Sequence, residues 1–134
     1  MLRRVRPAVA VALLLAFAGC GESGPTEEEQ VRSTLTAFSR ATAAKDYQAL
    51  CDRVFAPQLV RKLTQIGLPC EVAMQQSFEK VSNPRLTIGQ ITIAKDEKSA
   101  KAEVRSSATG QAPSRDTVTL VPVGDDGWRV SSLG

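Results

Sequence analysis

The chain has three cysteines and no histidine, and the spacing of the two internal cysteines limits their chemistry. Cys51 and Cys70 both fall on the apolar stripes of expected helices. A closed zinc site needs about four nitrogen or sulfur ligands, more than this pair supplies. Redox-active dithiols commonly use a C-x-x-C spacing, which this pair does not have. We therefore expect a Cys51–Cys70 disulfide, and two buried free thiols are the alternative.

The third cysteine, Cys20, follows a segment with the three parts of a secretory signal. Residues 1–19 begin with basic side chains, continue with an apolar run over 8–18 and end in small residues. The apolar run is shorter than the roughly 20 residues that span a bilayer. We therefore expect residues 1–19 to be a signal peptide that is removed. Its basic residues are Arg3, Arg4 and Arg6.

The end of this segment resembles the lipobox of bacterial lipoprotein signals. Ala18, Gly19 and Cys20 match that pattern, and Phe17 stands where leucine is usual. The resemblance implies lipid attachment to Cys20, which would hold the protein at the extracytoplasmic face of the cell membrane. The A-x-A sequence at 16–18 offers the alternative of ordinary cleavage and free secretion.

Cysteine parity favours the lipid-anchored form. Secreted domains usually pair their cysteines. Lipid on Cys20 leaves Cys51 and Cys70 as a pair in an oxidising compartment, whereas an unmodified Cys20 would leave one thiol without a partner. We expect residues 20–25 to be a short tether and residues 26–134 to be one domain.

The positive charge of the chain comes from the signal peptide. The sequence has 17 basic and 14 acidic residues, and three of the basic ones lie in the first six positions, which leaves 14 of each. A nucleic-acid-binding surface needs an excess of basic side chains. We therefore expect no nucleic-acid partner.

Capping signals and apolar spacing predict helices in the first half of the domain. Thr26 and Glu29 form a capping box that begins a helix over 26–44. The acidic first turn complements the helix dipole, which explains it without a metal site. Asp46 is expected to cap a second helix that ends near residue 55. Further helical patterns predict a short segment over 57–63 and a third main helix over 70–81.

After Pro84 the apolar pattern alternates, which predicts four strands. The first, over 86–93, changes parity at Gly89-Gln90, where we expect a bulge. A turn at 95–98 precedes the second strand. We expect a loop over 108–114, a third strand over 117–121, a hairpin turn at 124–127 and a last strand at 128–130. Helices followed by an antiparallel meander indicate an α+β fold with helices packed on one face of the sheet.

This layout resembles the small NTF2-like (cystatin-like) domains of actinobacterial lipoproteins, which are related to the SnoaL and ketosteroid-isomerase superfamily. The matching pieces are the helix over 31–44, the junction over 45–51 and the closing Gly127-Trp128-Arg129-Val130. The resemblance implies a curved sheet that wraps around a helix and leaves a conical cavity, where ligands or substrates would bind.

We expect a non-catalytic envelope domain that binds a small apolar ligand or a protein partner. Small side chains at Ala100, Ala102, Val104 and Ser106 would form the cavity wall. Packed aromatic residues that fill the cone are the competing expectation. Those aromatic residues are Phe38, Phe55, Phe78 and Trp128.

An isomerase, dehydratase or hydrolase is the alternative, and it would need a carboxylate base and a hydrogen-bond donor in one apolar pocket. Tyr47 is the candidate donor, and Asp46 or Asp52 the candidate base. Asp46 is better explained as a helix cap, and no pair matches the catalytic sets of the family, so we assign no catalytic, cofactor-binding or metal-binding residues. A third hypothesis is an interaction surface on the outer sheet face, formed by Lys101, Glu103 and Arg105.

Overall fold

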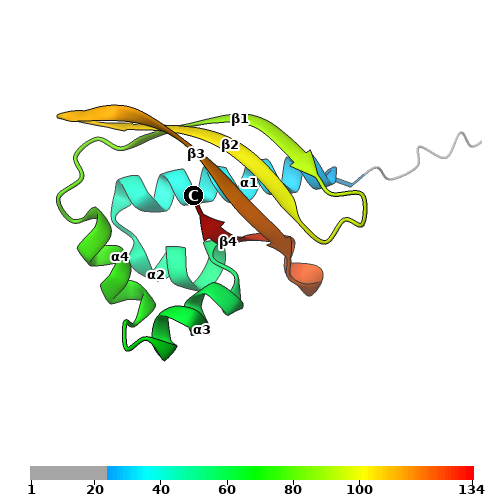
Figure 1. Cartoon of the computed structure of the whole chain (residues 1–134), viewed down its shortest axis with the longest axis horizontal. Helices are drawn as coiled ribbons and strands as arrows, with labels where there is room; N and C mark the ends of the chain where they lie inside the picture. Colours follow the sequence, from blue (N-terminus) through cyan, green and yellow to red (C-terminus); the bar gives the residue numbers. More distant parts are fainter. Residues whose placement is uncertain (1–23) are drawn as a thin grey trace, which may run out of the picture.

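The computed structural model describes residues 24–134, and Figure 1 shows their arrangement. The expected signal peptide, Cys20 and the start of the tether lie outside the described residues. The described chain has the expected α+β architecture, with helices first and a four-stranded antiparallel sheet afterwards. Its elements are α1 (Glu27–Ala44), α2 (Tyr47–Ala49), the π-helical turn η1 (Leu50–Val54), α3 (Pro57–Gln65), α4 (Cys70–Phe78), β1 (Arg85–Ile93), β2 (Ala100–Ala108), β3 (Gln111–Pro122), the 3-10 turn η2 (Gly124–Asp126) and β4 (Trp128–Leu133).

The capping box at the start of α1 is present. The backbone N–H of Glu29 donates to the Thr26 hydroxyl at 3.1 Å, and the backbone N–H of Thr26 donates to the Glu29 carboxylate at 2.9 Å. These two bonds satisfy donors that a helix start otherwise leaves unpaired. α1 ends at Lys45, whose backbone is left-handed with φ 55°. The sequence therefore predicted this helix and its first turn correctly.

The shorter helices are present where predicted and differ from expectation in their bounds. The segment after Asp46 is one turn of α-helix followed by η1, and it ends before Phe55, which is extended. The short helix predicted over 57–63 is present as α3, which continues to Gln65. α4 ends at Phe78 rather than at residue 81. The Lys45 ammonium donates to the Glu79 backbone oxygen at 2.6 Å and holds this end of α4 beside the end of α1.

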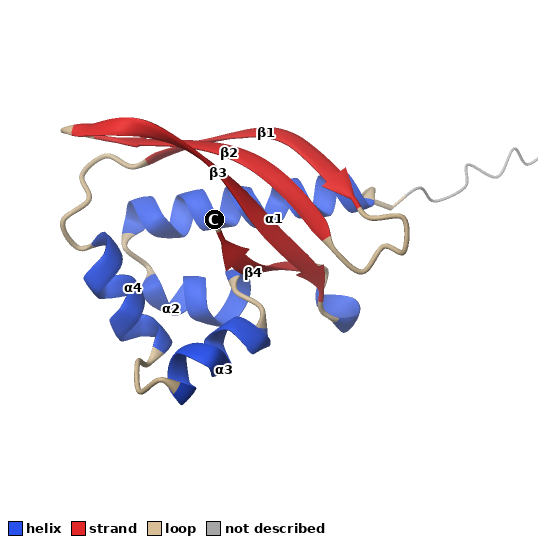
Figure 2. Cartoon of the chain, in the orientation of Figure 1, coloured by secondary structure: helices blue, strands red, loops and turns tan. Residues whose placement is uncertain are grey.

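The sheet has the order β1-β2-β3-β4 and curves over α1, as Figure 2 shows. The register between β1 and β2 shifts between Ile88 and Ile91, which confirms the bulge predicted from the parity change. A Cβ atom at Gly89 would lie 3.2 Å from the backbone oxygen of Glu103, so a larger residue would crowd the neighbouring strand there.

The expected loop over 108–114 is wrong. β2 extends to Ala108 and β3 begins at Gln111, so a turn at Thr109 and Gly110 connects two long strands. Gly110 has φ +76°, a conformation that glycine adopts without steric cost. Between the pairs Ser106–Ser114 and Ala108–Gln111 the register shifts. Pro113 lies within that shift, where a missing N–H costs the sheet little.

The core lies between α1, η1, α4 and the inner face of the sheet. Its fully buried side chains include Leu35, Leu50, Phe55 and Leu120. A disulfide joins Cys51 of η1 to Cys70, the first residue of α4, with 5.9 Å between their Cα atoms. Every core residue of the described part of the chain lies between 31 and 130. Residues 24–134 thus hold one contiguous hydrophobic core of their own, which makes them a suitable separate chain for experiments. Among these described residues, no helix is long and apolar enough to cross a membrane.

Candidate ligand cavity

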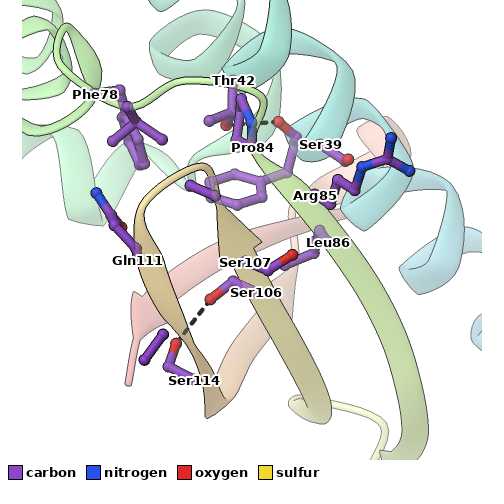
Figure 3. A pocket seen from close by; sticks show the side chains of 14 residues that line it. Ser39, Thr42, Phe78, Pro84, Arg85, Leu86, Ser106, Ser107, Gln111 and Ser114 are labelled. Carbon is purple, nitrogen blue, oxygen red and sulfur yellow. Dashed lines mark hydrogen bonds between the residues drawn. The ribbon is translucent and has the colours of Figure 1, made fainter.

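A partly enclosed cavity of about 150 Å³ lies between the C-terminal half of α1, the segment after α4 and the far end of the β2–β3 hairpin. Figure 3 shows the side chains around it. Its apolar lining comes from Phe38, Phe78, Val81, Pro84 and Leu86. The rest of the lining consists of two alanines, Arg85 and six residues with hydroxyl or amide side chains: Ser39, Thr42, Ser106, Ser107, Gln111 and Ser114. The cavity therefore combines an aromatic wall with a polar rim, and Arg85 is the only charged residue of its described lining.

The aromatic wall is built from two helices. The ring of Phe38, on α1, meets the ring of Phe78, on α4, with 6.4 Å between centroids and planes at 76°. Phe38 also lies against Phe55 on its core side, at 6.3 Å. Edge-to-face and tilted pairs at these separations are attractive. Phe38 is thus fixed between the filled core and the cavity.

The rim contains a chain of three side chains. The Ser106 and Ser114 hydroxyl oxygens are 2.8 Å apart, and the Ser114 hydroxyl donates to the Asp116 carboxylate at 3.0 Å. Ser106 and Ser114 face each other across β2 and β3. The nearby Thr42 hydroxyl donates to the Phe38 backbone oxygen at 2.8 Å, so its proton is already used within α1.

The hairpin is fastened to the segment after α4. The backbone N–H of Thr109 donates to the Ser82 backbone oxygen at 2.9 Å. The Asn83 side-chain amide donates to the Thr109 hydroxyl at 3.1 Å. These two bonds join the two sides of the cavity directly to each other.

The predicted cavity wall is mostly wrong. Ala100, Ala102 and Val104 are buried in the core, and Ser106 is the one predicted residue that lines the cavity. These three residues belong to the same buried core cluster as Phe55 and Trp128. The expectation of a filled cone is thus correct for its inner part, while Phe38 and Phe78 border the space that remains.

The residues considered for catalysis do not meet at the cavity. Asp46 accepts a hydrogen bond from the backbone N–H of Ala49 at 3.0 Å, which is the expected cap. Tyr47 packs against the core, and Asp52 is exposed. None of the three lines this cavity in the described part of the chain.

Two further sequence expectations concern polar residues outside the cavity. Residues 24–134 contain no group of three cysteine, aspartate or glutamate side chains placed to hold a metal ion. Lys101, Glu103 and Arg105 are exposed on the outer face of β2, as their alternation predicted.

Comparison with solved structures gives the fold a name. A protein of the NTF2-like family from Streptomyces avermitilis, named as a proposed dehydratase, superposes with a TM-score of 0.54 over 82% of this chain and 95% of its own, at 13% identity. The fold is NTF2-like. The Kfla4162 protein from Kribbella flavida is also similar, with a TM-score of 0.57, 21% identity, and coverage of 80% of this chain and 87% of its own.

The NTF2-like likeness is one of structure. No family model matches the sequence, and no curated protein matches it. At these identities the neighbours establish the fold and carry no activity over to this chain. The function must therefore be argued from the cavity itself.

Proposed function

We propose that this protein is a lipid-anchored domain of the bacterial cell envelope that binds a small apolar ligand in its cavity and performs no reaction on it. The observation that carries the proposal is the aromatic-walled cavity of about 150 Å³. A dry apolar cavity of about that volume accommodates a benzene-sized molecule. The ligand group would therefore be a single ring or a short branched chain, and any larger remainder would extend through the open side.

The lining supports binding rather than catalysis. Among the described residues that line the cavity, Arg85 is the only one with an ionisable side chain, and it is exposed. Acid–base catalysis requires a group that changes its protonation state within reach of the ligand. Serine, threonine and glutamine side chains can orient a ligand by hydrogen bonds and leave its covalent bonds unchanged.

The position of the cavity fits an anchor on Cys20. Thr26 caps the start of α1, and the cavity residues Phe38 and Thr42 lie near the other end of that helix. At 1.5 Å per residue, about 20 Å of helix separates the two. The cavity thus lies toward the end of α1 that is farther along the chain from the proposed lipid on Cys20.

Catalysis is the second candidate, favoured by one observation. The Asp116 carboxylate is joined through Ser114 to the rim, so a carboxylate lies one hydrogen bond from the cavity lining. If this is an enzyme, the wild-type protein will convert the molecule that co-purifies with it, and Asp116→Asn will not.

Native mass spectrometry of the protein purified from its own membranes tests the proposal. We expect a chain that begins at Cys20 with lipid attached and that releases a small apolar molecule on denaturation. Ser39→Phe, which places a ring in the cavity, should keep the lipid and lose the small molecule. An unmodified chain that begins at Gly19 would contradict the anchor. Equal small-molecule content in the wild type and Ser39→Phe would contradict binding in the cavity.

A further inference from the structure

The side chains at the rim are arranged by the register of β2 and β3. Ser106 pairs with Ser114, and Asp116 follows Ser114 by two residues, which puts both on the same face of β3. That face also carries Val118 and Leu120, which are buried. Asp116 therefore has the parity of the inner face of the sheet, but its side chain is exposed and does not line the cavity. Its link to the cavity is the hydrogen bond that it accepts from Ser114.

The hydrogen bonds that link Ser106, Ser114 and Asp116 all run in one direction. An ionised carboxylate has only acceptor sites, and a serine hydroxyl has one proton to donate. Ser114 gives its proton to Asp116 at 3.0 Å. The 2.8 Å contact between the two serines must then be a donation from Ser106 to Ser114. With its single proton used, the Ser106 hydroxyl has only lone pairs left for the cavity.

We propose that the cavity selects ligands that carry a hydrogen-bond donor on an apolar ring, and that Asp116 sets this preference by fixing Ser106 as an acceptor. This inference rests on the proposed function, since it concerns the ligand of the same cavity. Ser106 is the specificity-determining residue, and Ser114 and Asp116 are positioning residues that act through it. The ring would lie against Phe38 and Phe78, with its hydroxyl or amino group directed at Ser106.

Three probes of nearly equal size test the preference on residues 24–134. Phenol has a donor, toluene has a methyl group in its place, and anisole has an ether oxygen that only accepts. Because a net hydrogen bond is worth about 1 kcal/mol, we expect phenol to bind roughly 3- to 10-fold more tightly than either of the others. Dissociation constants from NMR titration provide the comparison.

Two pairs of variants locate the effect. Ser106→Ala should remove the phenol preference, whereas Ser39→Ala, which removes another hydroxyl from the lining, should keep it. Asp116→Ala frees the Ser114 proton, so Ser106 can donate into the cavity. The ratio of the anisole affinity to the phenol affinity should then rise by about 3-fold or more. Asp125→Ala, a change of an exposed acid in η2, should leave all three affinities unchanged.

The outcomes separate the two proposals. If no probe binds the wild-type protein, both the proposed function and this inference are wrong. If toluene, anisole and phenol bind equally well, or if Asp116→Ala leaves their order unchanged, the cavity binds ligands and the inference about donors is wrong.

Discussion

The rings of Phe38, on α1, and Phe78, on α4, meet edge to face, with 6.4 Å between their centroids. In the sequence, α2, η1 and α3 lie between the two residues. This contact forms the apolar wall of the cavity and joins the last turn of α4 to α1. The Lys45–Glu79 hydrogen bond lies beside it and holds the same helix ends together. The Phe38–Phe78 pair thus contributes both to the cavity wall and to the packing of the end of α4 on α1.

Phe78→Ala should destabilise the protein and remove one side of the cavity. Phe78 is half-buried, so we expect a loss of about 1–3 kcal/mol in the free energy of unfolding, below the range for a fully buried phenylalanine. Urea titration followed by circular dichroism measures it. Val72→Ala, an exposed position on α4, is the matched control and should change stability by less than about 0.5 kcal/mol. Equal effects from both changes would contradict the packing role of Phe78.

The Cys51–Cys70 disulfide should contribute strongly to stability. Replacing both cysteines with alanine opens a loop of about 20 residues, and the chain-entropy relation gives a loss of roughly 3 kcal/mol. We expect a lower melting temperature in the double variant and in reduced wild-type protein. Alkylation of unreduced protein followed by mass spectrometry provides an independent check. Two labelled thiols in the native chain would show that the bond does not form.

Asp46→Ala should reduce stability because Asp46 caps the helical segment that begins at Tyr47. Loss of an N-cap of this type costs about 1 kcal/mol. Asp52→Ala serves as the control, since Asp52 is exposed and its side chain makes no hydrogen bond within residues 24–134. If thermal unfolding shows the same midpoint for Asp46→Ala as for the wild type, the capping interpretation is wrong.

The sequence predicted those elements whose signals are local. The capping box at Thr26 and the cap at Asp46 depend on residues three positions apart, and both are present. The bulge near Gly89 was visible as a change of parity in one strand. The antiparallel pairing of β2 and β3 was predicted, but their extension to a two-residue turn was missed. Glycine, proline and small polar residues are typical of loops, and the sequence pattern did not show that residues 111–116 pair with β2.

The cavity was misplaced for a related reason. Alternation shows that Ala102 and Val104 face inward, but it does not show how deeply the aromatic side chains fill the cone against them. The space that remains begins further along β2, at Ser106. The hydrogen bond from Ser114 to Asp116 was not predicted, in part because Ser114 fell in the expected loop. Both residues nevertheless share the parity of the buried Val118. Extending that parity backwards from Val118 would have identified them.

Toluene binding by residues 24–134, followed by NMR, tests the central claim that the cavity binds a small apolar ligand. We expect saturable shifts confined to residues that line the cavity, including Phe38, Phe78, Leu86 and Ser106. Ser39→Phe, with its added ring in the cavity, should keep the folded spectrum and lose these shifts. No saturable shift in the wild type, or equal shifts in wild type and Ser39→Phe, would contradict the account.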